Sequence, residues 1–174
     1  MALAAEHVSR MQMIEPHTRG AHRLAEQLLG CPQRAADVVQ DATEKALTTA
    51  HFPARQSAKA WFLQVVRHLC IDQLRRQRKH VDDDVLGSHI APTEPLDSTL
   101  RETAGAVYEA LAALPFELRD LIVLRELNEC SYKEIAVIVG IAEGTVMSRL
   151  HKARLALRSE FKRRTGEDSD DYRS

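Results

Sequence analysis

Basic and hydroxyl side chains recur at helical spacing near the end of the 174-residue chain. Positions three and four apart share one face of a helix, and donors on such a face can contact base edges in a DNA major groove. Residues 143–164 hold 7 basic and 2 acidic side chains, and the later ones, from Arg154 on, suit phosphates. The pattern predicts a DNA-reading helix, with a solvated basic face as the alternative. The residues at this spacing are Thr145, Ser148, Arg149 and Lys152.

A second basic cluster lies beside two aromatic residues in the middle of the chain. This combination suits single-stranded nucleic acid, because arginines pair with phosphates and bases stack on aromatic rings. Trp61 and Phe62 also fit the alternative that both rings belong to the hydrophobic core. The basic members of the cluster are Arg67, Arg75, Arg76, Arg78 and Lys79.

An acidic stripe precedes this cluster. Apolar residues at positions 35, 38, 39, 42 and 46 follow the helical period, which predicts a buried face. Polar residues fall at the same spacing on another, exposed face, and a carboxylate stripe of this kind can meet a basic protein surface. The polar residues are Asp37, Gln40, Asp41 and Glu44.

Helix start and stop signals in the first half surround the acidic stripe. Gly30 is expected to end one helix, and Pro32 suits the first turn of the helix that carries the stripe. A further helix is expected from about Ser57, with an apolar face that includes Phe62 and a basic end.

The second half has the spacing of a helix-turn-helix. Pro115 can open one helix. Ser131 followed by Glu134 predicts a capping box on a short helix that Gly140 ends, and a longer helix starts near Glu143. A short helix, a glycine turn and a longer basic helix together indicate DNA recognition.

Composition favours an all-α fold. The chain is 44% hydrophobic, which is enough for a core, whereas 7 glycines, 6 prolines and 5% aromatic residues disfavour sandwiches and barrels. The formal net charge of −1 argues against a protein that coats nucleic acid indiscriminately.

The charge is unevenly distributed along the chain. It is +5 over residues 1–80, −5 over 81–103, +2 over 104–164 and −3 over 165–174. We predict two small helical domains, 1–80 and 104–164, joined by an acidic flexible linker, 81–103, and followed by an acidic tail, 165–174. One hypothesis is that the acidic segments compete with DNA for the basic faces in the free protein.

Signals for export, membrane insertion and metal binding are absent. The longest apolar run, residues 135–142, is far short of the roughly 20 residues that span a bilayer, so we expect a soluble cytoplasmic protein. Cys31, Cys70 and Cys130 form no C-x-x-C pair, and the eight histidines form no i, i+4 pair. The aspartates at 82–84 could hold Mg²⁺ only with a fixed geometry. We therefore predict no metal and no cofactor.

Three segments carry a family resemblance, namely DVVQDATEKAL, WFLQVVRHLCIDQLRRQR and LAALPFELRDLIVLRELNECSYKEIAVIVGIAEGTVMSRLHKARLAL. Over about residues 15–162 the chain resembles regions two and four of an extracytoplasmic-function (ECF, group IV) sigma factor of bacterial RNA polymerase. The resemblance implies a non-enzymatic protein that binds core RNA polymerase and promoter DNA and directs promoter-specific initiation. It also implies an anti-sigma factor as a further partner.

The resemblance implies a role for each site. The segment that docks on the clamp-helix coiled coil of the polymerase corresponds to Asp37, Gln40, Asp41 and Glu44. The segment that captures and melts the minus-ten element corresponds to Trp61, Arg67, His68, Asp72, Arg75, Arg76 and Arg78, with a flipped-out base held near His68. The reader of the minus-thirty-five element corresponds to Thr145, Ser148, Arg149, His151, Lys152 and Arg154.

Some positions depart from the family pattern. Met147 stands where a basic residue is usual, which removes one DNA contact, and Ala142 stands where a capping serine is common. His68 occupies a position often held by asparagine, and Thr43, Glu44 and Lys45 replace more apolar residues. These changes affect the expected promoter sequence rather than the fold.

Two other functions fit the sequence less well than a promoter-specificity subunit. The first is a sigma-like interaction protein that sequesters a regulator or polymerase without initiating transcription, which Met147 and the uncapped helix would permit. The second is a metal-dependent nuclease that uses the aspartates at 82–84.

Overall fold

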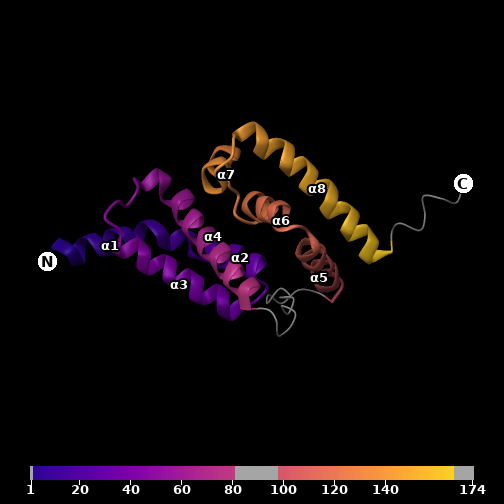
Figure 1. Ribbon diagram of the computed structural model, residues 1–174, viewed down its shortest axis with the longest axis horizontal. Coiled ribbons are helices and arrows are strands. Elements are labelled where there is room, and N and C mark those ends of the chain that lie inside the picture. The colour runs from indigo at the N-terminus through magenta and orange to yellow at the C-terminus, as the bar shows by residue number, and fades with distance from the viewer. Residues whose placement is uncertain (1, 81–97, 167–174) are drawn as a thin grey trace, which may run out of the picture.

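The computed structural model describes residues 2–80 and 98–166, and every element in these ranges is helical (Figure 1). The all-α prediction is therefore confirmed for the described chain. Residues 2–80 form an N-terminal module, and residues 98–166 form a C-terminal module. The first contains α1 (Ala2–Ile14), a short 3-10 turn (Glu15–His17), α2 (Thr18–Leu29), α3 (Pro32–Thr48) and α4 (Arg55–His80).

In the N-terminal module, α2 ends and α3 begins at the glycine and the proline that the sequence predicts for these positions. Gly30 ends α2 with a φ of 64°, a left-handed conformation that glycine adopts without steric cost. Pro32 is the first residue of α3, where its missing N–H costs no helical hydrogen bond. Helix α4 begins at Arg55, slightly before the predicted start.

The C-terminal module begins inside the predicted linker. Helix α5 spans Ser98–Ala113, so the expectation of an unstructured segment as far as residue 103 is wrong. It is followed by α6 (Phe116–Ile122), a π-helical turn η2 (Val123–Leu127), α7 (Tyr132–Val139) and α8 (Glu143–Thr165). The predicted acidic linker within 81–97, including the aspartates at 82–84, lies outside the described residues, as does the tail beyond residue 166.

Each module buries an apolar stripe of its helices, and on α3 it is the stripe that the sequence predicts. On α3 the buried residues are Ala35, Val38, Val39, Ala42 and Ala46. On α8 they are Val146, Leu150 and Ala153. Phe62 of α4 is fully buried, so for this ring the core alternative is confirmed.

An arginine that the sequence analysis missed fixes α1 against the end of α3. Buried Arg10 donates hydrogen bonds to the carbonyl oxygens of Ala46, Leu47 and Thr49, at 3.2, 3.0 and 2.7 Å. These carbonyls lie at the C-terminal end of α3, where no intrahelical N–H remains to satisfy them. Arg10 also stacks over the ring of Phe52, 5.4 Å from its centroid.

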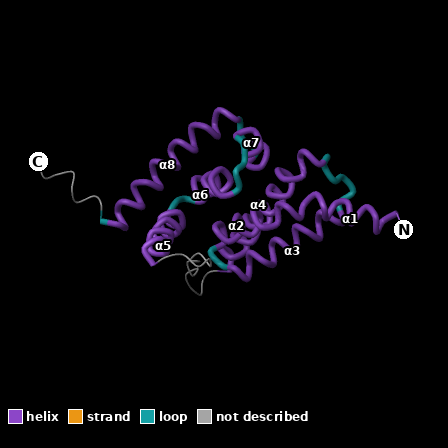
Figure 2. The backbone as a smooth tube through the Cα atoms, turned by 180° about the vertical axis from the view of Figure 1, so that it is seen from behind, coloured by secondary structure: helices purple, strands orange, loops and turns teal. Residues whose placement is uncertain are grey.

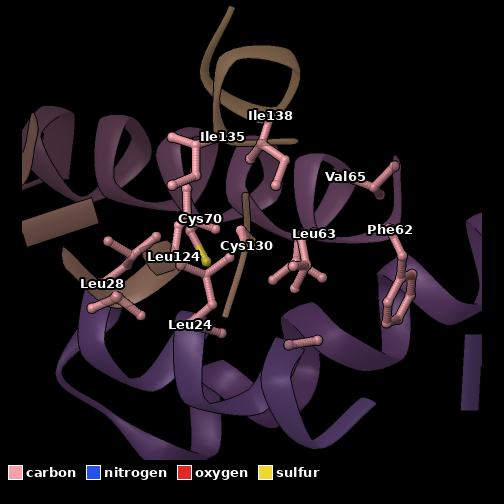
Figure 3. Close-up of a cluster of buried hydrophobic side chains, with 14 of the residues drawn as sticks. Leu24, Leu28, Phe62, Leu63, Val65, Cys70, Leu124, Cys130, Ile135 and Ile138 are labelled. Atoms are coloured by element: carbon pink, nitrogen blue, oxygen red, sulfur yellow. The ribbon is translucent and has the colours of Figure 1, made fainter. Parts of the chain in front are cut away.

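The two modules are docked on each other rather than separated. Helix α4 packs along α7, and α2 packs against η2 and α6, with α3 on the far side of the N-terminal module (Figure 2). One hydrophobic core runs across both modules. Figure 3 shows this cluster, in which the labelled residues include Leu24, Leu28, Leu63, Cys70, Leu124, Cys130, Ile135 and Ile138.

In the described part of the chain, no helix has both the length and the apolar character needed to cross a lipid bilayer.

Candidate nucleic-acid and polymerase interfaces

The acidic stripe on α3 faces solvent. Asp37, Gln40, Asp41 and Glu44 are all exposed, directly opposite the buried face of the same helix. Gln40 donates a hydrogen bond of 3.2 Å from Nε2 to Oε1 of Glu44 on the same exposed face. Thr43 bonds back to the carbonyl of Val39, so the polar residues at 43–45 do not disturb the core. The stripe can receive a basic surface without rearrangement.

Trp61 on α4 is half-buried and lies against the loop that precedes the helix. Its ring meets the ring of Phe52 edge-on, with centroids 5.3 Å apart and an interplanar angle of 60°. This geometry is favourable for aromatic pairs and holds the indole at the molecular surface. Trp61 is thus partly core and partly available for stacking, whereas Phe62 is core alone.

The C-terminal part of α4 presents most of the predicted basic surface. His68, Asp72, Arg75, Arg76 and Arg78 are exposed. Arg75 lies 3.7 Å from Asp72 in a pair that is largely open to solvent, and such pairs contribute little to stability. These side chains can therefore turn toward a nucleic-acid backbone at little cost.

Arg67 differs from its neighbours, because it is held by the C-terminal module. Its Nε donates to Oδ2 of Asp120 at 2.5 Å, and the side chains are 11% and 1% exposed. Burial raises the pKa of the Asp120 carboxyl, and the nearby Arg67 opposes that shift. The sequence predicts Arg67 among the minus-ten residues, and in this conformation its side chain is paired within the chain, with Asp120.

The turn between α7 and α8 has the geometry that the sequence predicts. Ser131 accepts a hydrogen bond from the N–H of Glu134 at 3.1 Å, and the Glu134 carboxylate accepts from the N–H of Ser131 at 2.7 Å. This reciprocal pair starts α7. Gly140 ends it with a φ of 77°, and Ala142 begins α8 without a side-chain cap.

Helix α8 exposes its reading face along its first two turns. Ser148, Arg149, His151 and Lys152 are exposed and Thr145 is half-buried, while the opposite face packs on the module core. Among the described residues, no hydrogen bond or ion pair engages the side chain of Arg149 or Lys152. Met147 is 55% exposed within the same turns and offers no donor to DNA. Over residues 2–80 and 98–166, Arg149 and Lys152 therefore have no partner and lie next to polar donors, as a major-groove reader requires.

Arg154 does not belong to this face. Its Nε and Nη2 donate to Oε1 of Glu126 at 3.1 and 2.6 Å, and this carboxylate holds the pKa of Arg154 above its ordinary value. It lines an apolar groove between α5, α6 and α8 together with Val107, Leu157 and Phe161. The sequence prediction grouped it with the DNA contacts because it lies in the same basic run.

Asp120, Gly20 and Asn128 connect the modules, and no motif in the sequence marks them for this role. Asp120 pairs with a residue 53 positions away, so no local spacing could reveal it. Within residues 2–80 and 98–166, no group of three or more His, Cys, Asp or Glu side chains is arranged to hold a metal ion.

Comparison with known families assigns both modules. Residues 13–80 match the family model described as Sigma-70 region 2, and residues 104–157 match the one described as Sigma-70, region 4. The class is therefore that of the sigma factors, with α3 and α4 in region 2 and the α7–α8 pair in region 4.

Curated relatives identify the type of sigma factor to which this chain belongs. The ECF RNA polymerase sigma factor SigM of Mycobacterium tuberculosis is 33% identical over 159 residues, which cover 84% of this chain and 74% of the relative. SigL of the same species is 35% identical over 164 residues, which cover 90% of this chain and 91% of the relative. The chain belongs to the ECF family of RNA polymerase sigma factors, and its function is to direct transcription initiation at promoters.

Solved structures agree with this fold. A sigma factor RpoE in complex with the anti-sigma factor NepR from Bartonella quintana superimposes with a TM-score of 0.68 at 27% identity and covers 87% of this chain and 95% of that one. CnrH, in complex with the cytosolic domain of CnrY, gives a TM-score of 0.65 at 21% identity. The match covers 91% of this chain and 94% of CnrH. The second likeness shows the fold alone.

Proposed function

We propose that this chain is a group IV sigma factor whose three surfaces divide the work of initiation. The acidic stripe on α3 docks on core polymerase, the exposed part of α4 captures the melted minus-ten strand, and the reading face of α8 recognises the minus-thirty-five element. Region-two functions are assigned to residues 1–80 and region-four functions to 104–164. The observation that carries the proposal is the face of α8, where Arg149 and Lys152 have no partner within the described part of the chain and lie opposite a buried stripe.

Docking through α3 follows from charge and exposure. The carboxylates of Asp37 and Asp41 are exposed on a helix whose other face is fixed in the core. Complementary charge on the partner then contributes orientation and association rate more than raw affinity. The fixed position of α3 in the core favours binding, because an acidic stripe on a mobile segment would lose conformational entropy when it binds.

Strand capture by α4 needs no chemical step. Unstacking a base costs a few kcal/mol, and a stacking surface with phosphate-neutralising arginines can offset that cost. Trp61 supplies the aromatic surface, and Arg75, Arg76 and Arg78 supply the charge. Because these groups bind the separated strand better than the duplex, they shift the equilibrium toward the open form. We propose accordingly that the chain works as a cytoplasmic binding subunit without catalysis, metal or cofactor.

An anti-sigma factor is the proposed regulatory partner. One similar structure is the sigma factor RpoE in complex with the anti-sigma factor NepR. Its likeness to this chain supports a partner of that kind, which would keep the sigma factor from the promoter.

Selection of promoters by reconstituted holoenzyme tests the function. A library with randomised upstream sequence is transcribed with core polymerase and this chain, and the transcribed templates are sequenced. The proposal predicts enrichment of two separated sequence elements. Templates enriched no more than with core polymerase alone would contradict it.

The docking surface has its own test. Asp37→Lys with Gln40→Ala reverses charge on the exposed stripe and should weaken binding to core polymerase at least tenfold, with helical content unchanged. The matched control is Glu15→Lys with Gln12→Ala, which makes the same changes at exposed positions of the N-terminal module away from the stripe. Equal affinity of the two double variants would defeat the assignment to α3.

A further inference from the structure

Met147 is an exposed apolar side chain within the first two turns of α8. It is 55% exposed, and it shares one strip of the helix surface with Gly144, three residues before it, and His151, four residues after it. Both of these neighbours are exposed as well. A helix rises about 1.5 Å per residue, so Met147 lies about 6 Å from the start of α8 at Glu143. Its thioether therefore enters any groove that admits the reading face.

Gly144 leaves the surface beside Met147 open. Helical side chains lean toward the N-terminus of their helix, so the Met147 side chain extends over the turn that contains Gly144. A Cβ atom at Gly144 would meet no atom within 4 Å among the described residues, and its φ is not positive. Neither packing within the described chain nor backbone conformation therefore requires glycine at this position. An open helix surface of this kind suits the close approach of a ligand.

The core of the C-terminal module uses other residues of α8. Val146, Leu150 and Ala153 are buried in it, whereas Met147 lies outside the core of the described chain. Single exposed apolar residues are common on protein surfaces, and exposure alone assigns them no function. Leu155 is also 55% exposed, but it lies about 12 Å further along α8 than Met147. Only Met147 belongs to the N-terminal turns, which are the part of a recognition helix that contacts base edges.

A methionine in a major groove has one favourable partner among the base edges. Its side chain has no hydrogen-bond donor, and its sulfur is a weak acceptor. The base edges exposed in the groove are donors and acceptors, except for the C5-methyl group of thymine. A polar base atom covered by the thioether would lose water without gaining a hydrogen bond, which costs free energy. Met147 therefore favours thymine and disfavours the other bases at the position it faces.

Arg149 and Lys152 can fix the position of Met147 relative to the bases. Both are exposed and have no partner among the described residues, and cationic side chains at such positions reach phosphates and guanine edges. Contacts with phosphates set the register of a helix in the groove but do not directly read sequence. With the register set, the same base pair faces Met147 in every complex. A single apolar contact can then select the base at that position.

We propose that Met147 is a specificity-determining residue, which contacts the C5-methyl group of one thymine in the minus-thirty-five element. This role rests on the proposed function, because it requires the first turns of α8 to lie in the major groove. The methionine, at a position where a basic residue is usual, then does more than remove a contact. It replaces a polar contact by an apolar one and gives this chain a preference for thymine.

Deoxyuridine in place of thymidine tests the contact, because this replacement removes only the C5-methyl group. The minus-thirty-five element is taken from promoters selected by the holoenzyme, and each of its thymines is replaced in turn. At one position the loss of the methyl group should weaken binding of the holoenzyme about fourfold. An element in which no single replacement weakens binding would overturn the role of Met147.

Variants at position 147 assign the methyl effect to this side chain. Met147→Ala should bind the thymine and uracil elements equally. Met147→Leu should keep most of the preference because it stays apolar, and Met147→Gln should lose it because its side chain has a similar length but a polar end. Leu155→Ala is the matched control, since it removes an equally exposed apolar side chain from the same helix and should leave the preference unchanged. A preference that Met147→Ala retains would overturn the proposal.

Promoter selection with the Met147→Ala holoenzyme gives a second readout. Enrichment of thymine at one position of the minus-thirty-five element should fall, and the minus-ten element should be unchanged. Unaltered enrichment of thymine would contradict the role of Met147 while leaving the proposed function intact, because the holoenzyme would still select two elements. Failure of the unmodified holoenzyme to enrich any element would instead defeat the proposed function, and the role of Met147 with it.

Discussion

Helices α4 and α8 carry the same kind of basic surface in opposite states. Arg149 and Lys152 on α8 are exposed and unpaired among the described residues, whereas Arg67 on α4 is enclosed by the C-terminal module. Both helices are long, and both bury one apolar stripe in their own module. The difference comes from what covers the second face of each helix. On α8 this face is exposed to solvent, whereas on α4 it packs against α7 and its Arg67 pairs with Asp120 of α6.

The contrast shows that a basic side chain of these helices stays open to a partner where no carboxylate of the described chain holds it. Arg154 makes the same point within α8, since Glu126 pairs with it, whereas Arg149, five positions earlier, has no such carboxylate among the described residues. An intramolecular carboxylate acts at high effective concentration and competes with phosphate before DNA arrives.

The largest expected effect concerns the core that supports α4. Phe62 is fully buried, so Phe62→Ala should lower the free energy of unfolding by about 3–5 kcal/mol in urea denaturation. The control is Leu155→Ala on α8, which is 55% exposed and should change stability by less than about 0.5 kcal/mol. A loss below about 1 kcal/mol for Phe62→Ala would show that the packing around α4 differs from that described.

The second-largest expected effect is on promoter binding, and it compares Arg149 with Arg154, which pairs with Glu126. Arg149→Ala should weaken binding of holoenzyme to a selected minus-thirty-five element by about 1–3 kcal/mol and relax selectivity at one position. Arg154→Ala removes an equal charge from the same helix but mainly breaks the pair with Glu126, so its effect should be smaller. Equal losses from the two substitutions, or a loss from Arg149→Ala that is uniform across sequences, would assign both to phosphate.

Helix α7 begins with a capping box, whereas α8 begins without a side-chain cap. This difference predicts two changes in stability of opposite sign. Ser131→Ala removes half of the capping box and should destabilise the protein by about 1 kcal/mol. Ala142→Ser gives α8 the cap that it lacks and should stabilise the protein by a similar or smaller amount. Thermal denaturation compares both with the unmodified chain. An unchanged midpoint for Ser131→Ala would mean that the capping box does not contribute.

The smallest effect is a pH dependence from the thiols of Cys70 and Cys130, which are buried where the modules meet. Burial raises the pKa of Cys70 to about 12 and that of Cys130 to about 11, so the native structure favours the protonated form, relative to an ordinary value of 9.0. The resulting stability is complete below pH 9 and is lost as the pH rises toward 11. Each thiol should therefore contribute a loss of about 0.8 kcal/mol at pH 9.5. Urea denaturation at pH 7.5 and 9.5 measures this, and the double variant Cys70→Ala/Cys130→Ala should show a smaller loss. An equal loss in the double variant would assign the pH dependence to other groups.

The sequence predicts what depends on near neighbours in the chain. Gly30, Pro32, the capping box of Ser131 and Glu134, and the buried stripe of α3 all act within one or two helical turns, and all lie where expected. The family resemblance placed the three candidate surfaces through the same local motifs, and the structure leaves the α3 stripe and the first turns of α8 exposed.

Contacts between distant positions could not be predicted from these patterns. Arg67 meets Asp120 across 53 residues, and Gly20 meets Asn128 across the same boundary between modules. Nothing in the sequence distinguishes Arg10 from an ordinary surface charge. It is buried against the end of α3, because the last carbonyl groups of that helix need a hydrogen-bond donor. Helical period identifies a buried face but gives no information about which helix covers it.

Energy transfer between dyes on the two modules tests the central claim, that α4 and α8 engage separate promoter elements, most directly. Cysteines introduced at Ser57 and Lys133, both exposed and both within two residues of the Lys59–Glu134 contact, would be labelled in a variant that lacks Cys31. We predict that these positions lie within about 20 Å in the free protein and move apart by several tens of ångströms when holoenzyme binds a selected promoter, since the two elements are about 85 Å apart along B-form DNA. Equal transfer in the free protein and in the promoter complex would contradict both the docked arrangement of the free protein and the engagement of separate elements.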